Sequence, residues 1–408
     1  MRRLLIAQLS DLHLGANLSG GRLALPSRKA AQRRDEHRGC LERFAQHVRE
    51  SRPDMVLMPG DLFDSGEPSI DDLNFLISTV NSMQPTPVFI APGNHDGYET
   101  SSAYNVASAL YQGRGGGPKW GSHVHLFTAE QFETVSIPHH RDVTVTGAAF
   151  LRHMPESRRV LAELEPPPPE GCHVLLFHGS LEHYPRVGLD KEVLPFTAAE
   201  VEAAGYRYAA VGHYHHGGAI AGADGRVLGA YAGAPFAMAV DDEGVGCWLE
   251  IAVEPGQPLS EDSLTWHRAD ERAVRRLEVD VTGPTDTTAL GRRVDEALAA
   301  AGASEGDIVW LALRGRLARG IDFQPQAALA ERFFHAAVDD SAVEPDYEID
   351  LDGTLPEEPG LAATTEEMFR WRMHKLYQAA SSDEERRRVK HALFYGLDAL
   401  TLGEIHLR

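Results

Sequence analysis

The N-terminal part of the chain, up to about residue 250, alternates short apolar runs with longer amphipathic segments. Runs that predict buried strands are LLIAQL, DMVLM, PVFIA, HVLLF and YAAV. Between them, apolar residues recurring every three or four positions predict helices over 33–49, 70–82 and 102–111. This alternation of strand and helix is typical of an α/β fold.

The pattern changes twice further along the chain. From about Gly217, segments such as RVLGAYAG and GCWLEIAV predict short alternating strands. Beyond residue 275, a small α/β module is predicted from a strand RRLEVDV, a helix 287–301, a strand DIVWLALRG, a helix 324–338 and a strand YEIDL. Two more helices are predicted over 365–379 and 383–400. We therefore expect a catalytic domain over 1–268, a cap domain over 269–355 and a helical tail over 356–408.

Both tail helices carry apolar residues at spacings of three and four, which form a stripe that must be buried somewhere. The stripe comprises Met368, Trp371 and Met373 in the first helix and Leu393, Phe394, Leu397 and Leu400 in the second. Two interpretations are open at this stage. The stripe packs on the chain's own catalytic domain, or it binds a partner.

Composition describes an ordinary globular protein, since 43% of the 408 residues are hydrophobic and 24% are charged. The three cysteines, Cys40, Cys172 and Cys247, lie far apart, which favours free thiols in a reducing cytosol over a disulfide framework. The apolar run near the N-terminus is short and lacks a cleavage site, and no run approaches the ~20 apolar residues of a membrane span. We expect a soluble cytoplasmic protein that does not contact membranes.

The formal net charge of −21 argues against nucleic-acid binding, because DNA-binding proteins usually carry a basic surface. Bound divalent cations would offset part of this charge locally. Five cations also cluster near the N-terminus: Arg28, Lys29, Arg33, Arg34 and Arg38. They form either a solvated helix face or a contact for phosphates.

Five polar motifs each follow directly on a predicted buried strand. Ligand sites of open α/β sheets lie just beyond the carboxyl ends of the strands, so these motifs should converge on one crevice. They are SDLHLG with Asp11 and His13, GDLFD with Asp61 and Asp64, GNHD with Asn94, His95 and Asp96, FHGS with His178, and GHYHHG with His213 and His215.

The residue types in these motifs indicate a metal centre. Imidazole and carboxylate ligands without thiolates suit manganese, iron or zinc rather than magnesium or calcium. One aspartate can bridge two ions about 3.5–4 Å apart, the arrangement used for in-line phosphoryl displacement. Taken singly, Asp-x-His usually marks a polar strand end and Gly-Asp a turn, whereas Gly-Asn-His-Asp is rarer and more telling. Together, and in this order, they predict a two-metal phosphoesterase.

The motif set resembles the calcineurin-like metallophosphoesterase superfamily, and within it the nuclease subunits of the SbcCD type. The resemblance is greatest to the bacterial YhaO-like branch of DNA-repair exonucleases. It covers residues 1–253 for the catalytic part, and the branch is suggested by the length, the cap and the closing KHALFYGLDAL. The resemblance implies a sandwich of two mixed β-sheets flanked by helices, with a small α/β cap and a helical tail.

The resemblance also implies roles for individual residues. It places Asp11, His13 and His215 on a first ion, Asn94, His178 and His213 on a second, and Asp61 between the two. His95 would stabilise the transition state or act as general acid, with Asp96 orienting it, whereas the role of Asp64 stays open. The ions would be Mn²⁺, with Fe²⁺ or Zn²⁺ as alternatives.

The leading hypothesis is a DNA-end-processing exonuclease or endonuclease that works in DNA repair. It would act with an SMC-like ATPase bound to the C-terminal helices. A homodimer is a further expected assembly. The alternative is a phosphodiesterase for small molecules such as cyclic nucleotides, or a phosphatase. A non-catalytic scaffold is disfavoured because the ligand set is complete. One departure bears on DNA: the YhaO-like branch carries polar and basic residues in the loop after the last motif, whereas here the run from Asp241 to Glu243 is acidic.

Overall fold

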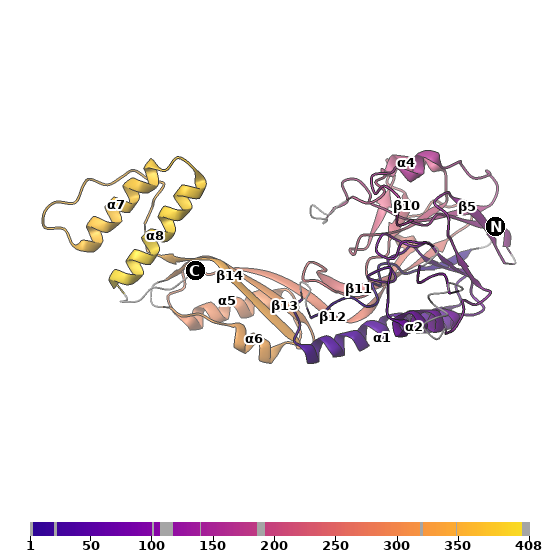
Figure 1. Ribbon diagram of the computed structural model, residues 1–408, viewed down its shortest axis with the longest axis horizontal. Coiled ribbons are helices and arrows are strands. Elements are labelled where there is room, and N and C mark those ends of the chain that lie inside the picture. Colours follow the sequence, from indigo (N-terminus) through magenta and orange to yellow (C-terminus); the bar gives the residue numbers. More distant parts are fainter. Residues whose placement is uncertain are drawn as a thin grey trace. The chain divides into compact units, whose positions relative to one another are not determined.

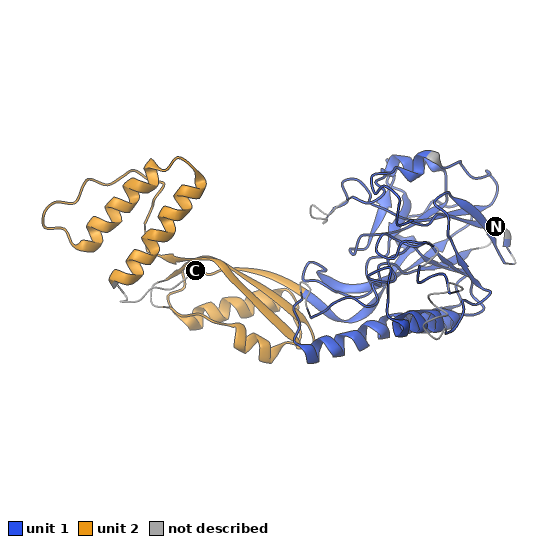
Figure 2. Cartoon of the chain, in the orientation of Figure 1, with its two compact units in different colours: residues 1–274 blue, residues 275–408 orange. Residues whose placement is uncertain are grey.

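The computed structural model describes residues 3–19, 23–99, 102–106, 117–138, 140–185, 192–318, 321–347 and 349–401. The chain divides into two compact units, residues 1–274 and 275–408 (Figure 2). The division falls within strand β12 (Leu264–Asp280), six residues beyond the position expected from sequence. The further separation of a cap, 269–355, from a tail, 356–408, stays a prediction.

Two mixed sheets form the centre of the first unit (Figure 1). One has the order β12, β11 (Gly244–Val253), β1 (Leu4–Gln8), β2 (Met55–Met58), β3 (Val88–Ile90) and β4 (Val124–Leu126). The other has the order β5 (Glu133–Ile137), β6 (His140–Gly147), β7 (Cys172–His178), β8 (Tyr208–Gly212), β10 (Val227–Tyr231) and β9 (Gly218–Ala221). Apolar side chains from both sheets share one buried cluster, which confirms the expected sandwich.

Helices α1 (Ser27–Ser51), α2 (Ile70–Asn81) and α4 (Ala198–Ala204) lie in the first unit, with short 3₁₀ helices at Val160–Glu163 and Glu261–Ser263. Helix α1 starts six residues earlier than expected, because its buried face begins at Ala30 and recurs to Val48. In place of the helix expected over 102–111, residues 102–106 form bends and turns, and residues 107–111 lie outside the described part.

The basic cluster of α1 does not form a single solvated face. Arg33 is fully buried, and its two terminal nitrogens each lie 2.8 Å from an oxygen of Asp270. Arg38 pairs with Asp72 at 2.7 Å. Both interpretations offered for the cluster are therefore wrong for Arg33, because its guanidinium forms a buried ion pair with Asp270.

The second unit contains the strand order β14 (His335–Asp346), β13 (Ile308–Ala318) and β12, together with α5 (Thr287–Ala300) and α6 (Gln326–Arg332). The helix expected over 324–338 is wrong beyond Arg332, because the chain then pairs in parallel with β13. The described residues of the segment 347–351 do not form the expected strand. Tyr347 and Leu351 instead belong to a small buried core, which also contains Leu393, Phe394 and Leu397.

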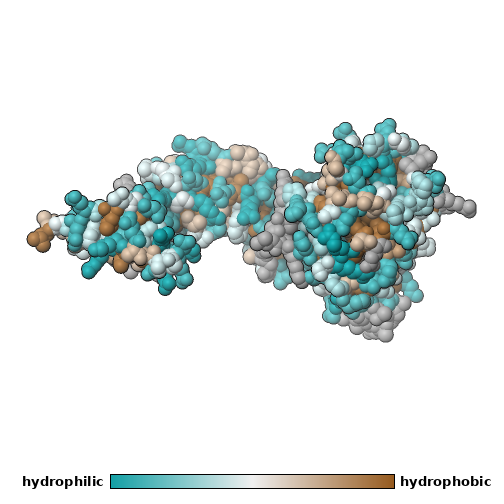
Figure 3. Space-filling model, turned by 90° about the horizontal axis from the view of Figure 1, so that it is seen from above, coloured by the Kyte–Doolittle hydropathy of each residue, from teal (hydrophilic) through white to brown (hydrophobic). Residues whose placement is uncertain are grey.

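Helices α7 (Thr365–Ala379) and α8 (Asp383–Thr401) follow the sequence prediction closely. The apolar stripe of α8 is mostly buried, since Leu393 and Leu397 are fully covered in that small core. The buried part of the stripe, Leu393, Phe394 and Leu397, therefore packs on residues of its own unit. Side chains that stay exposed are Leu361, Met368, Leu376 and Leu400, and apolar patches are visible at the end formed by these helices, at the left of Figure 3. No helix of the described residues is long and apolar enough to cross a membrane.

Candidate metal centre

The predicted ligands come together beyond the carboxyl ends of β1, β2, β3, β7 and β8. Two groups have potential ligand atoms within 4.8 Å of one another: Asp11, His13 and His215, and Asp61, His178 and His213. Eight non-glycine residues of the described part have a positive φ, and four of them are in these groups: Asp11, His13, Asp61 and His213. Such strained backbone persists where the surrounding structure enforces it, and it is concentrated at functional sites.

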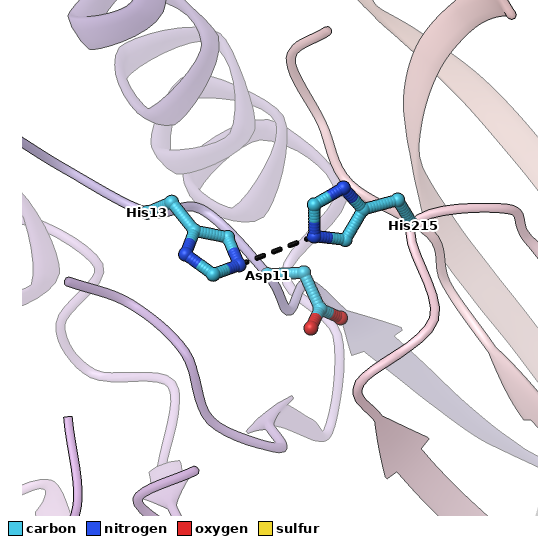
Figure 4. Close-up of side chains that lie close together, drawn as sticks. All are labelled: Asp11, His13 and His215. Atoms are coloured by element: carbon cyan, nitrogen blue, oxygen red, sulfur yellow. Dashed lines mark hydrogen bonds between the residues drawn. The ribbon is translucent and has the colours of Figure 1, made fainter. Parts of the chain in front are cut away.

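The first group joins the end of β1 to the loop after β8 (Figure 4). The Nε2 atoms of His13 and His215 face each other at 3.2 Å. Asp11 is fully buried, and its Oδ1 accepts a hydrogen bond from the backbone N–H of His213 at 2.9 Å. Its Oδ2 is buried and has no hydrogen-bond partner in the part of the chain that the structure describes. Two converging imidazole nitrogens beside an unsatisfied carboxylate oxygen form a donor set that fits a cation.

The second group, Asp61, His178 and His213, is also held in place by hydrogen bonds and burial. The Nδ1 of His178 donates to the carbonyl oxygen of Pro59 at 2.9 Å, which leaves Nε2 for a ligand. That Nε2 lies 2.9 Å from Asn94 Oδ1 and 3.4 Å from Asp61 Oδ2. Burial lowers the pKa of His213 to about 3, so this ring is neutral and its nitrogen lone pair is available to an ion.

Asp61 lies between the two groups. Its Oδ2 is 3.4 Å from His178 Nε2 in one group and 3.7 Å from His13 Nε2 in the other. Burial works against ionisation, but the neighbouring imidazoles, His178 foremost, outweigh it and hold the pKa of Asp61 below its ordinary value. One ionised oxygen thus faces both groups, as a bridging ligand requires.

At two positions near Asp61, Gly60 and Gly93, the backbone has no room for a side chain. A Cβ on Gly60, where φ is +88°, would lie 2.5 Å from the backbone nitrogen of Gly93. A Cβ on Gly93 would collide with Asp61 Oδ1. The glycines of the GDLFD and GNHD motifs therefore allow two loops to approach closely enough to bring their ligands together.

The GNHD loop also carries His95 and Asp96. His95 is exposed, and its Nδ1 donates to the backbone oxygen of Asp64 at 3.1 Å. Asp96 does not orient His95: its buried carboxylate accepts from the backbone N–H groups of Leu62 and Gly93, at 2.7 and 2.8 Å, and from the Tyr104 hydroxyl. It therefore stabilises the loop that carries Asp61.

Asp64, whose role the sequence left open, contacts a ligand. Its Oδ1 lies 3.3 Å from His13 Nδ1. That nitrogen is buried and makes no hydrogen bond within the described residues, so the Asp64 carboxylate lies beside the ring without hydrogen-bond geometry. Asp64 thus contacts two histidines, His13 through its side chain and His95 through its backbone.

Sequence reasoning missed Asp242, which it treated only as part of an acidic run. Its Oδ1 accepts from His215 Nδ1 at 2.9 Å, and its Oδ2 accepts from the backbone N–H groups of Met238 and Ala239 at 2.8 and 2.9 Å. Burial alone would lower the pKa of His215, but Asp242 outweighs it and raises that pKa to about 9. No local motif marks this residue, because the contact spans 27 positions of the chain.

The comparison with known families agrees with this geometry. The sequence pattern named "Calcineurin-like phosphoesterase" matches residues 4–217, which is 214 of the 408 residues and ends just beyond His215. The chain belongs to this family. Members of the family bind divalent metal ions, and the donor set described above fits such ions.

One relative of this phosphoesterase is named as a nuclease and another as a DNA repair protein. The D component of the nuclease SbcCD from Staphylococcus epidermidis is 26% identical over 148 residues, which cover 36% of this chain and 32% of that protein. "DNA double-strand break repair protein Mre11" of Nanoarchaeum equitans is 26% identical over 228 residues, which cover 52% of this chain and 57% of that protein. The matches thus span from about a third to just over half of these relatives.

Solved structures similar to the phosphoesterase include a Thermus thermophilus protein, 13% identical with a TM-score of 0.35, and a dimetal phosphatase from Danio rerio, 12% identical with a TM-score of 0.38. Each match covers 65% of this chain and 99% of the other.

A cavity of about 410 Å³ adjoins the metal centre of the phosphoesterase on the His215 side. Its lining includes His215, Phe236 and Trp266 together with the carboxylates Asp242, Glu243 and Glu261. His216, which follows the ligand His215, lines this cavity and is not part of either ligand group.

Proposed function

We propose that this phosphoesterase is a two-metal phosphodiester hydrolase that processes DNA ends in DNA repair, as an exonuclease or endonuclease. The observation that carries the proposal is the position of Asp61 Oδ2, 3.4 Å from His178 and 3.7 Å from His13. A carboxylate oxygen shared by two histidine groups suits two adjacent ions, which when bound stabilise the attacking and leaving oxygens of phosphoryl transfer.

The chain's own residues would divide the work as follows. Asp11, His13 and His215 would hold one ion, and Asn94, His178 and His213 the other. Asp61 would bridge them. We take Mn²⁺ as the working ion, with Fe²⁺ or Zn²⁺ as alternatives, because the ligands are imidazoles and carboxylates without thiolates.

His95 is the group best placed to act on the substrate. Its ring is exposed and packs edge-on against His13, with centroids 4.7 Å apart. The Asp64 carbonyl occupies its Nδ1, so the protonated ring can donate from Nε2 to a phosphate oxygen or to the leaving oxygen.

The DNA substrate is inferred from the two relatives named above as a nuclease and a double-strand break repair protein. An SMC-like ATPase partner is part of the same proposal. The exposed apolar side chains of Leu361, Met368 and Leu376 offer it a helical docking surface, since they are not used by the small core beneath α7 and α8.

A second candidate is hydrolysis of small phosphodiesters. The acidic lining of the cavity beside His215 favours it, because Asp242, Glu243 and Glu261 repel every phosphate of a long DNA strand, whereas a small phosphodiester brings a single negative charge. Its volume of about 410 Å³ is within the range of about 300–1,000 Å³ that is typical of small-molecule sites.

One experiment separates these candidates. The purified chain is incubated with Mn²⁺ and end-labelled linear duplex DNA, and in parallel with a cyclic nucleotide, using Asp61→Asn as the inactive control. Shortening of the DNA that is lost in the control supports the nuclease. If the cyclic nucleotide is hydrolysed while the DNA stays intact, the small-phosphodiester hydrolase replaces the nuclease as the proposed function. Inactivity on both substrates would refute the hydrolase proposal.

A further inference from the structure

A second cluster of metal-ligating side chains lies in the first unit and shares no residue with the centre described above. It consists of His47 on α1, Glu250 on β11 and His267 on β12. One potential ligand atom of each residue lies within 4.8 Å of the other two. The Nε2 of His47 is 2.9 Å from Glu250 Oε2, and the two imidazole centroids are 4.6 Å apart.

The cluster is built into the fold rather than assembled from loose surface side chains. Register places His267 directly opposite Trp248 on the neighbouring strand. The two rings stack with centroids 5.6 Å apart and an interplanar angle of 9°. Glu250 projects from the same face of β11 as Trp248, because side chains alternate along a strand.

His267 carries an unsatisfied nitrogen. Its Nε2 atom is buried and has no hydrogen-bond partner among the described residues. A buried polar atom of this kind normally has a partner, and a cation held jointly with His47 and Glu250 would be one.

We propose that His47, Glu250 and His267 bind a zinc ion. Two imidazoles and one carboxylate without thiolates are a recognised zinc donor set, with a water molecule in the fourth position. The side chains of His47 and Glu250 are 21% and 20% exposed, which leaves access for the ion and for that water.

The ion would join α1 to the two neighbouring strands. The same helix contributes Arg33 and His37, and the latter hydrogen-bonds to the backbone oxygen of Leu12, between Asp11 and His13. Zinc at His47 is therefore expected to stabilise the helix that supports the catalytic loop, without contacting substrate.

Crystals of the full chain grown with micromolar Zn²⁺ provide a direct test, with anomalous diffraction collected at the zinc edge. We expect an anomalous peak about 2.0–2.2 Å from one atom of each of the three residues. Peaks confined to the centre around Asp61 would overturn the proposal.

Zinc counting in solution tests the proposal independently of catalysis. After dialysis against micromolar Zn²⁺, the unsubstituted chain should retain one more equivalent than His267→Gln or Glu250→Gln. Glu250→Gln keeps a hydrogen-bonding partner for His47 but loses the anionic ligand. His125→Gln is the matched control, since His125 pairs with a single carboxylate, Glu133, at 3.2 Å.

We also expect added zinc to raise the melting temperature of the unsubstituted chain and of the His125→Gln control more than that of Glu250→Gln. Equal zinc content in folded Glu250→Gln and unsubstituted protein would show that His47 and Glu250 form only an ion pair. That result would refute the site.

Discussion

Replacing Arg33 by methionine should destabilise the first unit strongly. Arg33 and Asp270 are both fully excluded from solvent, and two bonds of 2.8 Å join them. Arg33 also donates to Glu36 and to the backbone oxygen of Ala237. Removing one member of a buried pair leaves an uncompensated charge and costs about 3–5 kcal/mol. The upper part of this range is less expected here, because the Asp270 carboxylate keeps two backbone donors.

Urea unfolding followed by circular dichroism would measure this loss, with Arg33→Met, Asp270→Asn and the double variant forming a cycle. If the pair is coupled as the distances imply, Asp270→Asn should cost at least about 2 kcal/mol less when Arg33 is already methionine. The cycle cancels any penalty that the new amide incurs at its backbone neighbours. Additivity of the two substitutions within about 0.5 kcal/mol would refute the reasoning.

Four further predictions concern the centre and the tail. His95→Ala should retain bound metal but lose about 10²–10⁴-fold in turnover, and metal analysis showing loss of both ions would contradict its role. Asp61→Asn should lose more metal than Asp64→Asn, whose effect should be about 10–100-fold; equal loss would argue against bridging. Burial lowers the pKa of His37 to about 4, so as the pH falls this imidazole is protonated in the unfolded chain before it is protonated in the folded one. The unfolding free energy should therefore fall by about 3 kcal/mol between pH 6.5 and 4. His37→Gln should lose this pH dependence. Truncation after Gly360 should leave hydrolysis of a small ester intact and abolish capture of the ATPase partner, and loss of ester hydrolysis would make the tail part of the catalytic fold.

The sandwich could be predicted from sequence because its signals are local. Buried strands are short apolar runs, and each is followed at once by its polar motif. The tail helices were predictable for the same reason, since an N-cap such as Thr364, bonded to the backbone N–H of Glu367, marks the start of α7 within four residues. The sequence also predicted the groups that lie together at the centre, because parallel strands end at the same edge.

The features that sequence reasoning missed depend on long-range contacts. Strand β14 forms because residues from His335 onward find β13 as a partner, whereas their local pattern is equally compatible with a helix. Asp242 reaches His215, and Arg33 reaches Asp270, only after the sheets have assembled. Charged residues in a run look like solvated surface until the fold shows which of them point inward.

Asp61 uses its two oxygens for different tasks. Oδ2 faces the histidines that would hold the ions, while Oδ1 accepts the backbone N–H of His95 at 2.9 Å. The imidazole that would act on the substrate is therefore tethered, through a hydrogen bond from its own backbone, to the carboxylate that we propose as the bridge. The rate should then depend on the radius of the ion as well as on its Lewis acidity, because an ion that displaces the Asp61 carboxylate also shifts the peptide of His95. A series of divalent ions should rank by size as well as by charge density in the rates it supports.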